Sequence, residues 1–149
     1  MRWALGAMLF CLCTQVMATS EQQAMRVVGD AIVAPLSDVT GSAEEGEQIF
    51  AARDAGHCVL CHQVSGLDAP FQGNIGPALS GIGDRLSPGQ IRLRIADASL
   101  LNAQTIMPSY YLIEGLHRVD ERYRGRTALS GAQIEHLVAY LAQLRSHKQ

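Results

Sequence analysis

Near the middle of the chain, three residues combine side chains and spacing suited to holding a cofactor covalently. The run Cys58-Val59-Leu60-Cys61-His62 has two thiols three positions apart and an imidazole directly after the second thiol. Thiols at this spacing can bond to the two vinyl groups on one edge of a haem, and the histidine that follows can bind the iron. The pattern therefore predicts one haem c attached through Cys58 and Cys61, with His62 as an axial ligand of the iron.

Two other uses of paired cysteines fit the surrounding sequence less well. A thioredoxin-like dithiol belongs near a βαβ unit, whereas this pair follows a predicted helix and no convincing strand pattern is present in the body of the chain. A structural zinc site needs four ligands, and only Cys58 and Cys61 remain once Cys11 and Cys13 are removed with an expected leader peptide. Haem attachment is therefore the favoured interpretation.

The second axial ligand must come from another part of the chain. The candidates are Met25, Met107, His57, His117, His136 and His147. A lone methionine more often fills a core, but Met107 precedes Pro108, whose rigid backbone could hold the thioether toward the iron. His57 adjoins Cys58 and cannot reach the opposite face of a haem. We therefore expect Met107 to be the ligand, with His117 as the main alternative.

The pair Gly76-Pro77 could support the histidine ligand. A metal-bound histidine usually donates its other ring N–H to a carbonyl or carboxylate. Proline is rigid, and the glycine before it permits a close approach, so the Pro77 carbonyl could accept this hydrogen bond from His62. An ordinary turn is the alternative.

The first residues have the layout of a secretory signal peptide. Arg2 precedes an uncharged, mostly apolar run from Trp3 to Val16, which ends in the small-x-small sequence Val16-Met17-Ala18. We expect cleavage after Ala18, which makes 1–18 a signal peptide and the location periplasmic. A retained anchor is less favoured, because the run is shorter than the roughly 20 residues that span a bilayer. The remaining chain is mildly acidic, which suggests neither nucleic acid nor an anionic membrane as a partner.

Three helices are predicted in the rest of the chain, each beginning at a serine cap. The first follows Ser42, with Glu45 completing a capping box, and runs to about Arg53. The second follows Ser87 and has Pro88 at its first position. In this second helix Gln90 completes the capping box, and one face carries Ile91, Ile95 and Ala98. The third helix follows Ser130, with Gln133 completing its capping box. Its apolar stripe consists of Ile134, Leu137, Leu141 and Leu144.

These elements predict an all-α domain over 41–149, preceded by an extended arm over 19–40. The arm contains the short apolar pairs Val27-Val28 and Ile32-Val33, separated by Gly29-Asp30, which suit an extended segment lying on another surface. Glycine- and proline-rich loops are expected at 66–83 and 115–130. A domain this small needs additional apolar mass in its core, and a haem would supply it.

Taken together, the motifs resemble class I cytochromes c. The matching parts are Gly46…Phe50, Cys58-Val59-Leu60-Cys61-His62, Gly76-Pro77-Ala78-Leu79, Met107-Pro108 and the last helix with Tyr140. The resemblance implies a class I cytochrome c fold, a small helical domain wrapped around one covalently bound haem. It also implies that the first and last helices cross near the haem edge, where small and aromatic residues meet.

The chain after the leader is more closely similar to the SoxX family, monohaem subunits of the SoxAX complex of bacterial sulfur oxidation. The segments that carry this resemblance are Val27 to Val33, 74–81, 95–97, 107–111, 115–119 and 129–141. It implies a partnership with a SoxA-like haem protein, which joins thiosulfate oxidatively to a cysteine of a SoxY-type carrier. This chain would accept the released electrons and pass them to a downstream cytochrome, with no catalysis of its own.

Two alternatives to that function remain open. A free-standing soluble cytochrome c could use the same ligands to carry electrons. A haem enzyme or gas sensor would require an open axial position, with Met107 not bound to iron. The arm at 27–33 and Tyr110-Tyr111 are candidate partner contacts, and packing within the domain is an equal alternative for both.

Overall fold

The computed structural model describes residues 25–146. The expected signal peptide at 1–18, the first residues of the arm and His147 therefore lie outside the described residues. The longer helices are α1 (Ala43–Ala51), α3 (Pro88–Asp97) and α4 (Gly131–Gln143), and α2 (Ile82–Arg85) is a single short turn. Three 3₁₀ turns complete the helical structure: η1 (Cys58–Leu60), η2 (Ala98–Leu100) and η3 (Glu121–Tyr123). The all-α class predicted from the sequence is confirmed.

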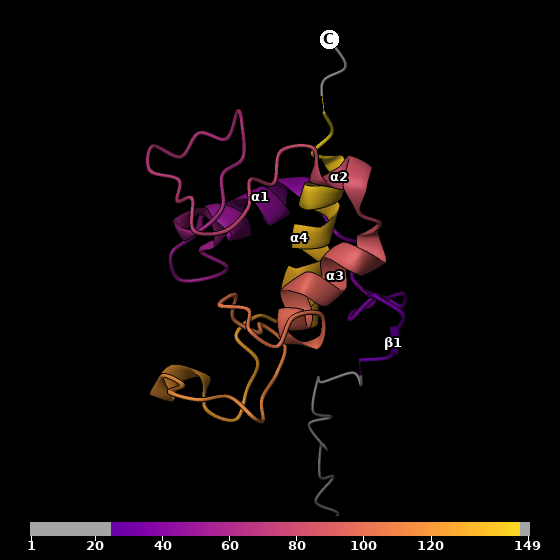
Figure 1. The fold of residues 1–149 in the computed structure, drawn as a ribbon, viewed down its shortest axis with the longest axis vertical. Helices are drawn as coiled ribbons and strands as arrows, with labels where there is room; N and C mark the ends of the chain where they lie inside the picture. Colours follow the sequence, from indigo (N-terminus) through magenta and orange to yellow (C-terminus); the bar gives the residue numbers. More distant parts are fainter. Residues whose placement is uncertain (1–24, 147–149) are drawn as a thin grey trace, which may run out of the picture.

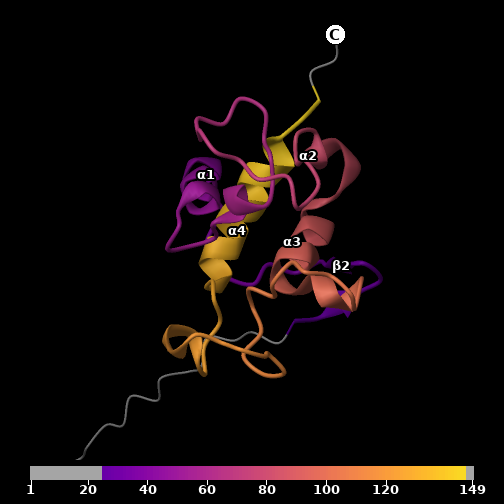
Figure 2. The ribbon, with the colours of Figure 1, turned by 60° about the vertical axis from the view of Figure 1, so that its left-hand side comes forward.

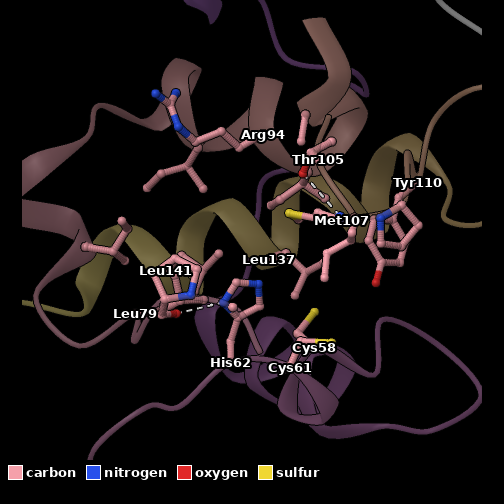
Figure 3. A pocket seen from close by; sticks show the side chains of 18 of the residues that line it. Cys58, Cys61, His62, Leu79, Arg94, Thr105, Met107, Tyr110, Leu137 and Leu141 are labelled. Carbon is pink, nitrogen blue, oxygen red and sulfur yellow. Dashed lines mark hydrogen bonds between the residues drawn. The ribbon is translucent and has the colours of Figure 1, made fainter. Parts of the chain in front are cut away.

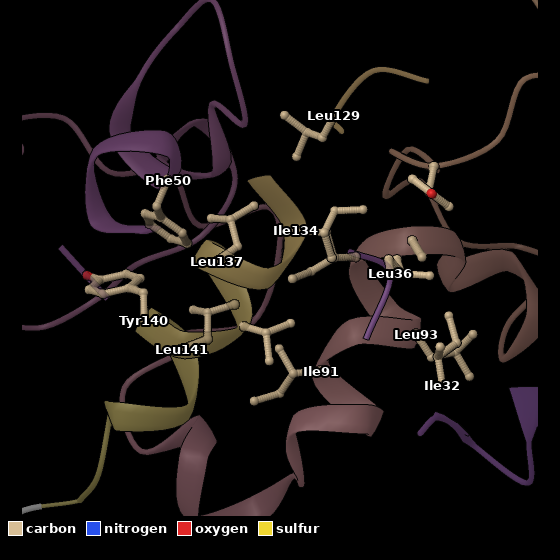
Figure 4. Packing of buried hydrophobic residues seen from close by; sticks show 14 of the residues in the cluster. Ile32, Leu36, Phe50, Ile91, Leu93, Leu129, Ile134, Leu137, Tyr140 and Leu141 are labelled. Atoms are coloured by element: carbon tan, nitrogen blue, oxygen red, sulfur yellow. The ribbon is translucent and has the colours of Figure 1, made fainter. Parts of the chain in front are cut away.

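Helix α4 is the centre of the domain. Figures 1 and 2 show α1 on one side of it and α2 and α3 on the other. Three residues of the predicted apolar stripe are buried, with Ile134 and Leu137 at most 1% and Leu141 6% exposed, whereas Leu144 caps the end of α4 and is half-buried. Figure 4 shows Leu137 beside Phe50 from α1, Leu141 beside Ile91 from α3, and Leu93 of α3 beside Ile32 of the arm. None of the helices within residues 25–146 is long and apolar enough to cross a membrane.

A close crossing of α1 and α4 depends on Gly46. A Cβ atom at this position would lie 2.1 Å from the His136 carbonyl oxygen and 2.7 Å from the Cβ of Tyr140. The missing side chain therefore lets the two backbones touch. One turn further along α1, the rings of Phe50 and Tyr140 pack with centroids 5.6 Å apart and planes tilted by 56°. Small and aromatic residues thus meet at this crossing, as the resemblance implied.

The arm is folded more tightly than the extended segment that we expected. Strands β1 (Val27–Val28) and β2 (Ala31–Ile32) form an antiparallel hairpin in which Val27 pairs with Ile32. Gly29 adopts a φ of +61° in the two-residue turn, which glycine does without strain. β2 packs against α3, and Ile32 is buried. The sequence pattern indicated extended backbone but not its reversal at Gly29.

The helix caps agree with the sequence at α3 and α4 and differ at α1. Both later helices have complete capping boxes, from Ser87 with Gln90 and from Ser130 with Gln133. At α1 the Glu45 N–H donates to the Ser42 hydroxyl, but the Ser42 N–H donates to Nδ1 of His136 at 2.9 Å. The Glu45 carboxylate instead lies 3.0 Å from Nε2 of His136. A histidine from α4 therefore replaces half of the predicted box.

The remaining boundaries shift by small amounts. α1 ends at Ala51 rather than near Arg53, and Ala98 begins the turn η2 rather than lying inside α3. The loops predicted at 66–83 and 115–130 are interrupted by α2 and η3. Both are single turns, too short to show a helical period in the sequence.

A buried ion pair joins the arm to the helices. Arg92 on α3 donates to both carboxylate oxygens of Glu135 on α4, at 2.8 and 2.7 Å, and both residues are at most 6% exposed. Arg92 also donates to the Ile32 carbonyl at 2.7 Å, and Glu135 accepts from the Leu36 N–H at 2.9 Å. The pair therefore satisfies backbone groups on either side of the bend that follows the hairpin.

Replacing Gly46 by alanine should destabilise the protein by at least about 2 kcal/mol, because the added methyl group meets backbone atoms that cannot move aside. Denaturant unfolding of the haem-loaded protein measures this loss. Gln48→Ala, an exposed change on the same helix, is the control and should leave stability within about 0.5 kcal/mol. Equal stability of the two variants would show that α1 and α4 can separate without cost.

Glu135→Gln should cost about 3 kcal/mol, since it leaves the Arg92 guanidinium buried without a counter-charge. Hydrogen exchange should also become faster at the Leu36 amide, which loses a charged acceptor. Glu121→Gln, which affects only an exposed pair with Arg124, should change neither measurement. If Glu135→Gln left the free energy of unfolding unchanged, the negative charge of Glu135 would add nothing to stability that a neutral glutamine amide does not also provide.

Candidate functional site

A cavity of about 520 Å³ opens between α1, α3, α4 and the loops that follow η1 and η2. Its walls are mainly aliphatic side chains of the helices, including Ile91 and Ile95 of α3 and Leu137 and Leu141 of α4. Figure 3 shows that Cys58, Cys61, His62 and Met107 all project into this space. Four of the predicted site residues are thus brought together, and Pro77 lies on the cavity wall beside them.

The turn η1 presents the two cysteines. The N–H groups of Cys61 and His62 both donate to the Cys58 carbonyl, at 3.1 and 2.9 Å, which places both sulfur atoms at one edge of the cavity. His57 begins the turn in the left-handed region, with φ +47° and ψ +35°, a conformation that is uncommon for a residue with a side chain. The backbone just before Cys58 is therefore held in a less favourable conformation by its surroundings.

Both cysteines are half-buried, and no disulfide joins them. Burial raises the pKa of the Cys58 thiol to about 12, and the neighbouring Cys61 adds to the increase while a backbone hydrogen bond opposes it. Before any thioether bond forms, the thiol rather than the thiolate is therefore the form of Cys58 at neutral pH. A thioether bond would replace this group by one that does not titrate.

His62 is held by a hydrogen bond and by close packing. Its Nδ1 lies 2.8 Å from the Pro77 carbonyl oxygen, which can only accept, so Nδ1 carries the proton and Nε2 keeps its lone pair. A Cβ atom on Gly76 would lie 2.4 Å from the imidazole, so the glycine backbone rests directly against the ring. The imidazole is thereby fixed with Nε2 free to bind a metal.

Met107 reaches the cavity from the opposite wall. Figure 3 shows its thioether and the His62 imidazole extending from different loops toward the same space. The Met107 N–H donates to the Thr105 hydroxyl at 3.2 Å, and the Tyr110 N–H bonds the Ile95 carbonyl of α3 at 3.3 Å. The loop that carries the thioether is therefore attached to α3 on the C-terminal side of Met107, while the bond to Thr105 is local to the loop.

Two further side chains position this loop: Asp97, and Tyr110, which was expected at a partner contact rather than at the cavity. Asp97, only 3% exposed, accepts hydrogen bonds from the hydroxyls of Ser99 and Ser109 at 2.5 and 2.7 Å. The Tyr110 hydroxyl donates to the Gly56 carbonyl at 2.9 Å and so ties the methionine loop to the cysteine loop. Desolvation raises the pKa of Tyr110 well above its usual value, which keeps this phenol protonated. The Asp97-x-Ser99 spacing was a local signal for the first of these contacts.

The two tyrosines offered as partner contacts pack inside the domain instead. Tyr111 is 1% exposed, and Tyr110 lines the cavity. In the arm, Ile32 is buried against α3, whereas Val28 and Val33 are more than half exposed. Packing within the domain therefore accounts for the tyrosines and for one face of the arm.

The other candidate ligands lie elsewhere or on the wrong side. His117 is exposed and does not line the cavity, and His136 is bound to Ser42 and Glu45 at the α1–α4 crossing. Met25 packs against the hydrophobic core. His57 lines the cavity next to Cys58. Among residues 25–146, Met107 is the candidate that faces His62.

The residues present fit a haem c. The space is lined by aliphatic side chains, as a large apolar macrocycle requires, and both thiols lie at one edge, where vinyl groups could bond to them. An imidazole nitrogen and a thioether sulfur approach from different sides, the donor pair found in cytochromes c. Cys58 and Cys61 would hold the macrocycle, and His62 and Met107 would hold the iron.

Comparison with known proteins agrees with this geometry. Residues 43–145 match the model of the cytochrome c family. Among solved structures, the chain is similar to one in the crystal structure of SoxXA from P. pantotrophus, with 35% sequence identity and a TM-score of 0.75. That alignment covers 82% of this chain and 95% of the other. No curated protein gives a match.

The family match includes both the cysteine turn and the methionine loop, and the structural match extends over most of the described chain. The class I cytochrome c fold and the covalently bound haem expected from the sequence are thus confirmed. This chain belongs to the cytochrome c family, as a SoxX-like cytochrome with one covalently bound c-type haem.

Proposed function

We propose that this protein is a periplasmic electron-transfer subunit that works with a SoxA-like haem partner. It accepts the electrons released when thiosulfate is joined to a cysteine of a SoxY-type carrier, and it passes them to a downstream cytochrome. The observation that carries the proposal is the 35% identity to a chain of the SoxXA structure, in an alignment that covers 82% of this chain and 95% of that one. The membership of the cytochrome c family supports the electron-carrier role itself.

Within the site, we assign Cys58 and Cys61 as the thioether attachment points and His62 Nε2 and Met107 Sδ as the axial ligands. The hydrogen bond from His62 Nδ1 to Pro77 supports the first ligand, because it orients the ring and makes Nε2 a better donor. The attachment of the methionine loop to Asp97 and Gly56 supports the second, since it holds the thioether opposite the imidazole. With His62 and Met107 both holding the iron, no position on it would remain open to a substrate.

The bound haem supplies an iron that takes up and releases one electron at a time. The chain's own residues determine how readily this happens. Leu137, Leu141 and Ile95 keep water away from the cavity wall, and a buried environment favours the less charged, reduced state. A thioether ligand favours reduced iron in comparison with a second histidine and so raises the reduction potential. These features suit a protein that accepts electrons.

Met107→Ala should open one axial position and lower the reduction potential by on the order of 0.1 V, within the roughly 0.8 V range that axial ligands span. The reduced variant should bind carbon monoxide rapidly, whereas the unaltered protein should be inert. Redox titration and optical spectra measure both effects. Met25→Ala is the matched control and should behave as the unaltered protein.

If the reduction potential of Met107→Ala were unchanged, the second iron ligand would have to be another residue. His117→Ala would then be tested in the same way. Rapid carbon monoxide binding by the unaltered protein would instead favour a haem enzyme or gas sensor. The two measurements thus separate the ligand assignment from the electron-transfer role.

The partner and the location are tested together in cells that are oxidising thiosulfate. We expect the tagged protein to be recovered from the periplasmic fraction, starting at Thr19, with the mass of residues 19–149 plus one haem. A second, larger haem protein should co-purify in equal amount. The Cys58→Ser/Cys61→Ser variant should lack the added mass.

Recovery of the haem-loaded protein as a monomer would favour a free-standing electron carrier over a SoxA-bound subunit. Recovery in the membrane fraction with residues 1–18 retained would contradict cleavage of the leader. Intact-protein mass spectrometry distinguishes these results, because it reports the first residue and the haem in one measurement.

A further inference from the structure

Arg94 is the one arginine or lysine among the described residues that line the cavity, and no aspartate or glutamate accompanies it there. It lies on α3 between the apolar wall residues Ile91 and Ile95, and about a third of its side chain is exposed. A guanidinium at the edge of a mostly apolar cavity needs a reason, because a neutral side chain would close the wall at a lower cost in desolvation.

The covalent chemistry of the site indicates which part of a haem would face Arg94. The two vinyl groups of a haem lie on adjacent pyrrole rings, and the two propionates lie on the other two rings. Attachment of the vinyl edge at Cys58 and Cys61 therefore directs the propionates toward the opposite edge of the cavity. Figure 3 shows Arg94 across the cavity from both sulfur atoms, with its guanidinium pointing away from them.

The guanidinium is oriented by its neighbours and is still available for another partner. Its Nη1 donates to the Gln90 carbonyl at 2.9 Å, and its Nη2 is 3.6 Å from the Asp30 carboxylate, which is too long for a hydrogen bond. Asp30 itself accepts from the Gln90 side chain at 2.8 Å. Of the five N–H donors of Arg94, only one is used by a hydrogen bond within residues 25–146.

We propose that Arg94 binds a propionate carboxylate of the haem, and that Asp30 and Gln90 hold the guanidinium in place for it. An ionised propionate beside apolar walls needs a cation or water, and an arginine can meet a carboxylate with two parallel hydrogen bonds. Because Asp30 lies in the turn of the β1–β2 hairpin, the arm then contributes to the charge at the haem edge. This inference depends on the attachment proposed for Cys58 and Cys61.

The positive charge of Arg94 also affects the iron. A nearby cation disfavours the ferric state, which carries one more positive charge than the ferrous state, so Arg94 raises the reduction potential. Asp30 has the opposite effect. Removing either charge should therefore shift the reduction potential in a direction that the charge predicts. If Arg94 only packed against its neighbours, its replacement would not be expected to shift the potential in a particular direction.

The test compares haem-loaded Arg94→Gln, Arg94→Lys and Asp30→Asn with the unaltered protein by redox titration. We expect Arg94→Gln to raise the ferric-to-ferrous ratio at a fixed ambient potential about tenfold, which for one electron is a fall of about 59 mV. Arg94→Lys keeps the charge and should show less than half of that shift. Asp30→Asn should shift the potential upward.

Infrared difference spectra between the two redox states, with ¹³C in the propionate carboxylates, test the contact itself. The labelled bands should move in both Arg94 variants, because the guanidinium donors are lost in each. Arg124→Gln, an exposed arginine on the loop after η3 that does not line the cavity, is the control and should alter neither the potential nor the bands. The near-infrared band of methionine-ligated ferric haem shows that the axial ligands are intact in each variant.

The proposal is overturned if the labelled bands of Arg94→Lys match those of the unaltered protein, or if Arg94→Lys lowers the potential as much as Arg94→Gln. The infrared result for Arg94→Lys decides the matter even if Arg94→Gln fails to retain haem. A failure of the attachment assignment is recognised separately, because the unaltered protein would then lack the added haem mass.

Discussion

The hydrogen bond between His62 and the Pro77 carbonyl is the contact on which the site depends, since it orients the imidazole that faces the cavity. The chain between these residues is shaped to make it. The N–H of Gly73 bonds the Val59 carbonyl, that of Gly76 bonds the Cys61 carbonyl, and each bond is 2.8 Å long. These bonds fold the loop back onto the cysteine turn. The thiols, the imidazole and its acceptor thus form one local unit.

The opposite wall of the cavity depends on contacts between distant segments, because Met107 is far from His62 in the sequence. Its loop is tied to α3 through Asp97 and to the cysteine turn through the bond from Tyr110 to Gly56. Both contacts are half-buried or buried, where hydrogen bonds between oriented groups are strong. The separation of the two walls is therefore set by polar contacts, while the aliphatic side chains between them set the polarity of the space.

Helix α3 connects the arm to this arrangement. Arg92 joins the hairpin and α4 through a buried ion pair, and Arg94, two residues later, lies at the cavity edge beside the hairpin turn. Residues two apart on a helix point in different directions, so one arginine is directed into the domain and the other along its edge. The arm is thus a structural part of the domain and extends as far as the site. The exposed valines of the hairpin, Val28 and Val33, remain on its outer surface.

The sequence by itself determined the features that depend on a few neighbouring residues. Attachment of a haem needs two thiols and an imidazole within five positions, and a helix start needs a serine and a residue three positions later, so both are readable without the fold. Tertiary structure decided what distant segments contribute. His136 replaces Glu45 in the cap of α1 because Gly46 lets the two helices touch, and Met107 rather than His117 faces His62 because of where Asp97 and Tyr110 hold its loop. The packing of the hairpin on α3, the Arg92–Glu135 pair and the position of Arg94 beside Asp30 likewise depend on contacts across 43 or more residues, which no local pattern specifies.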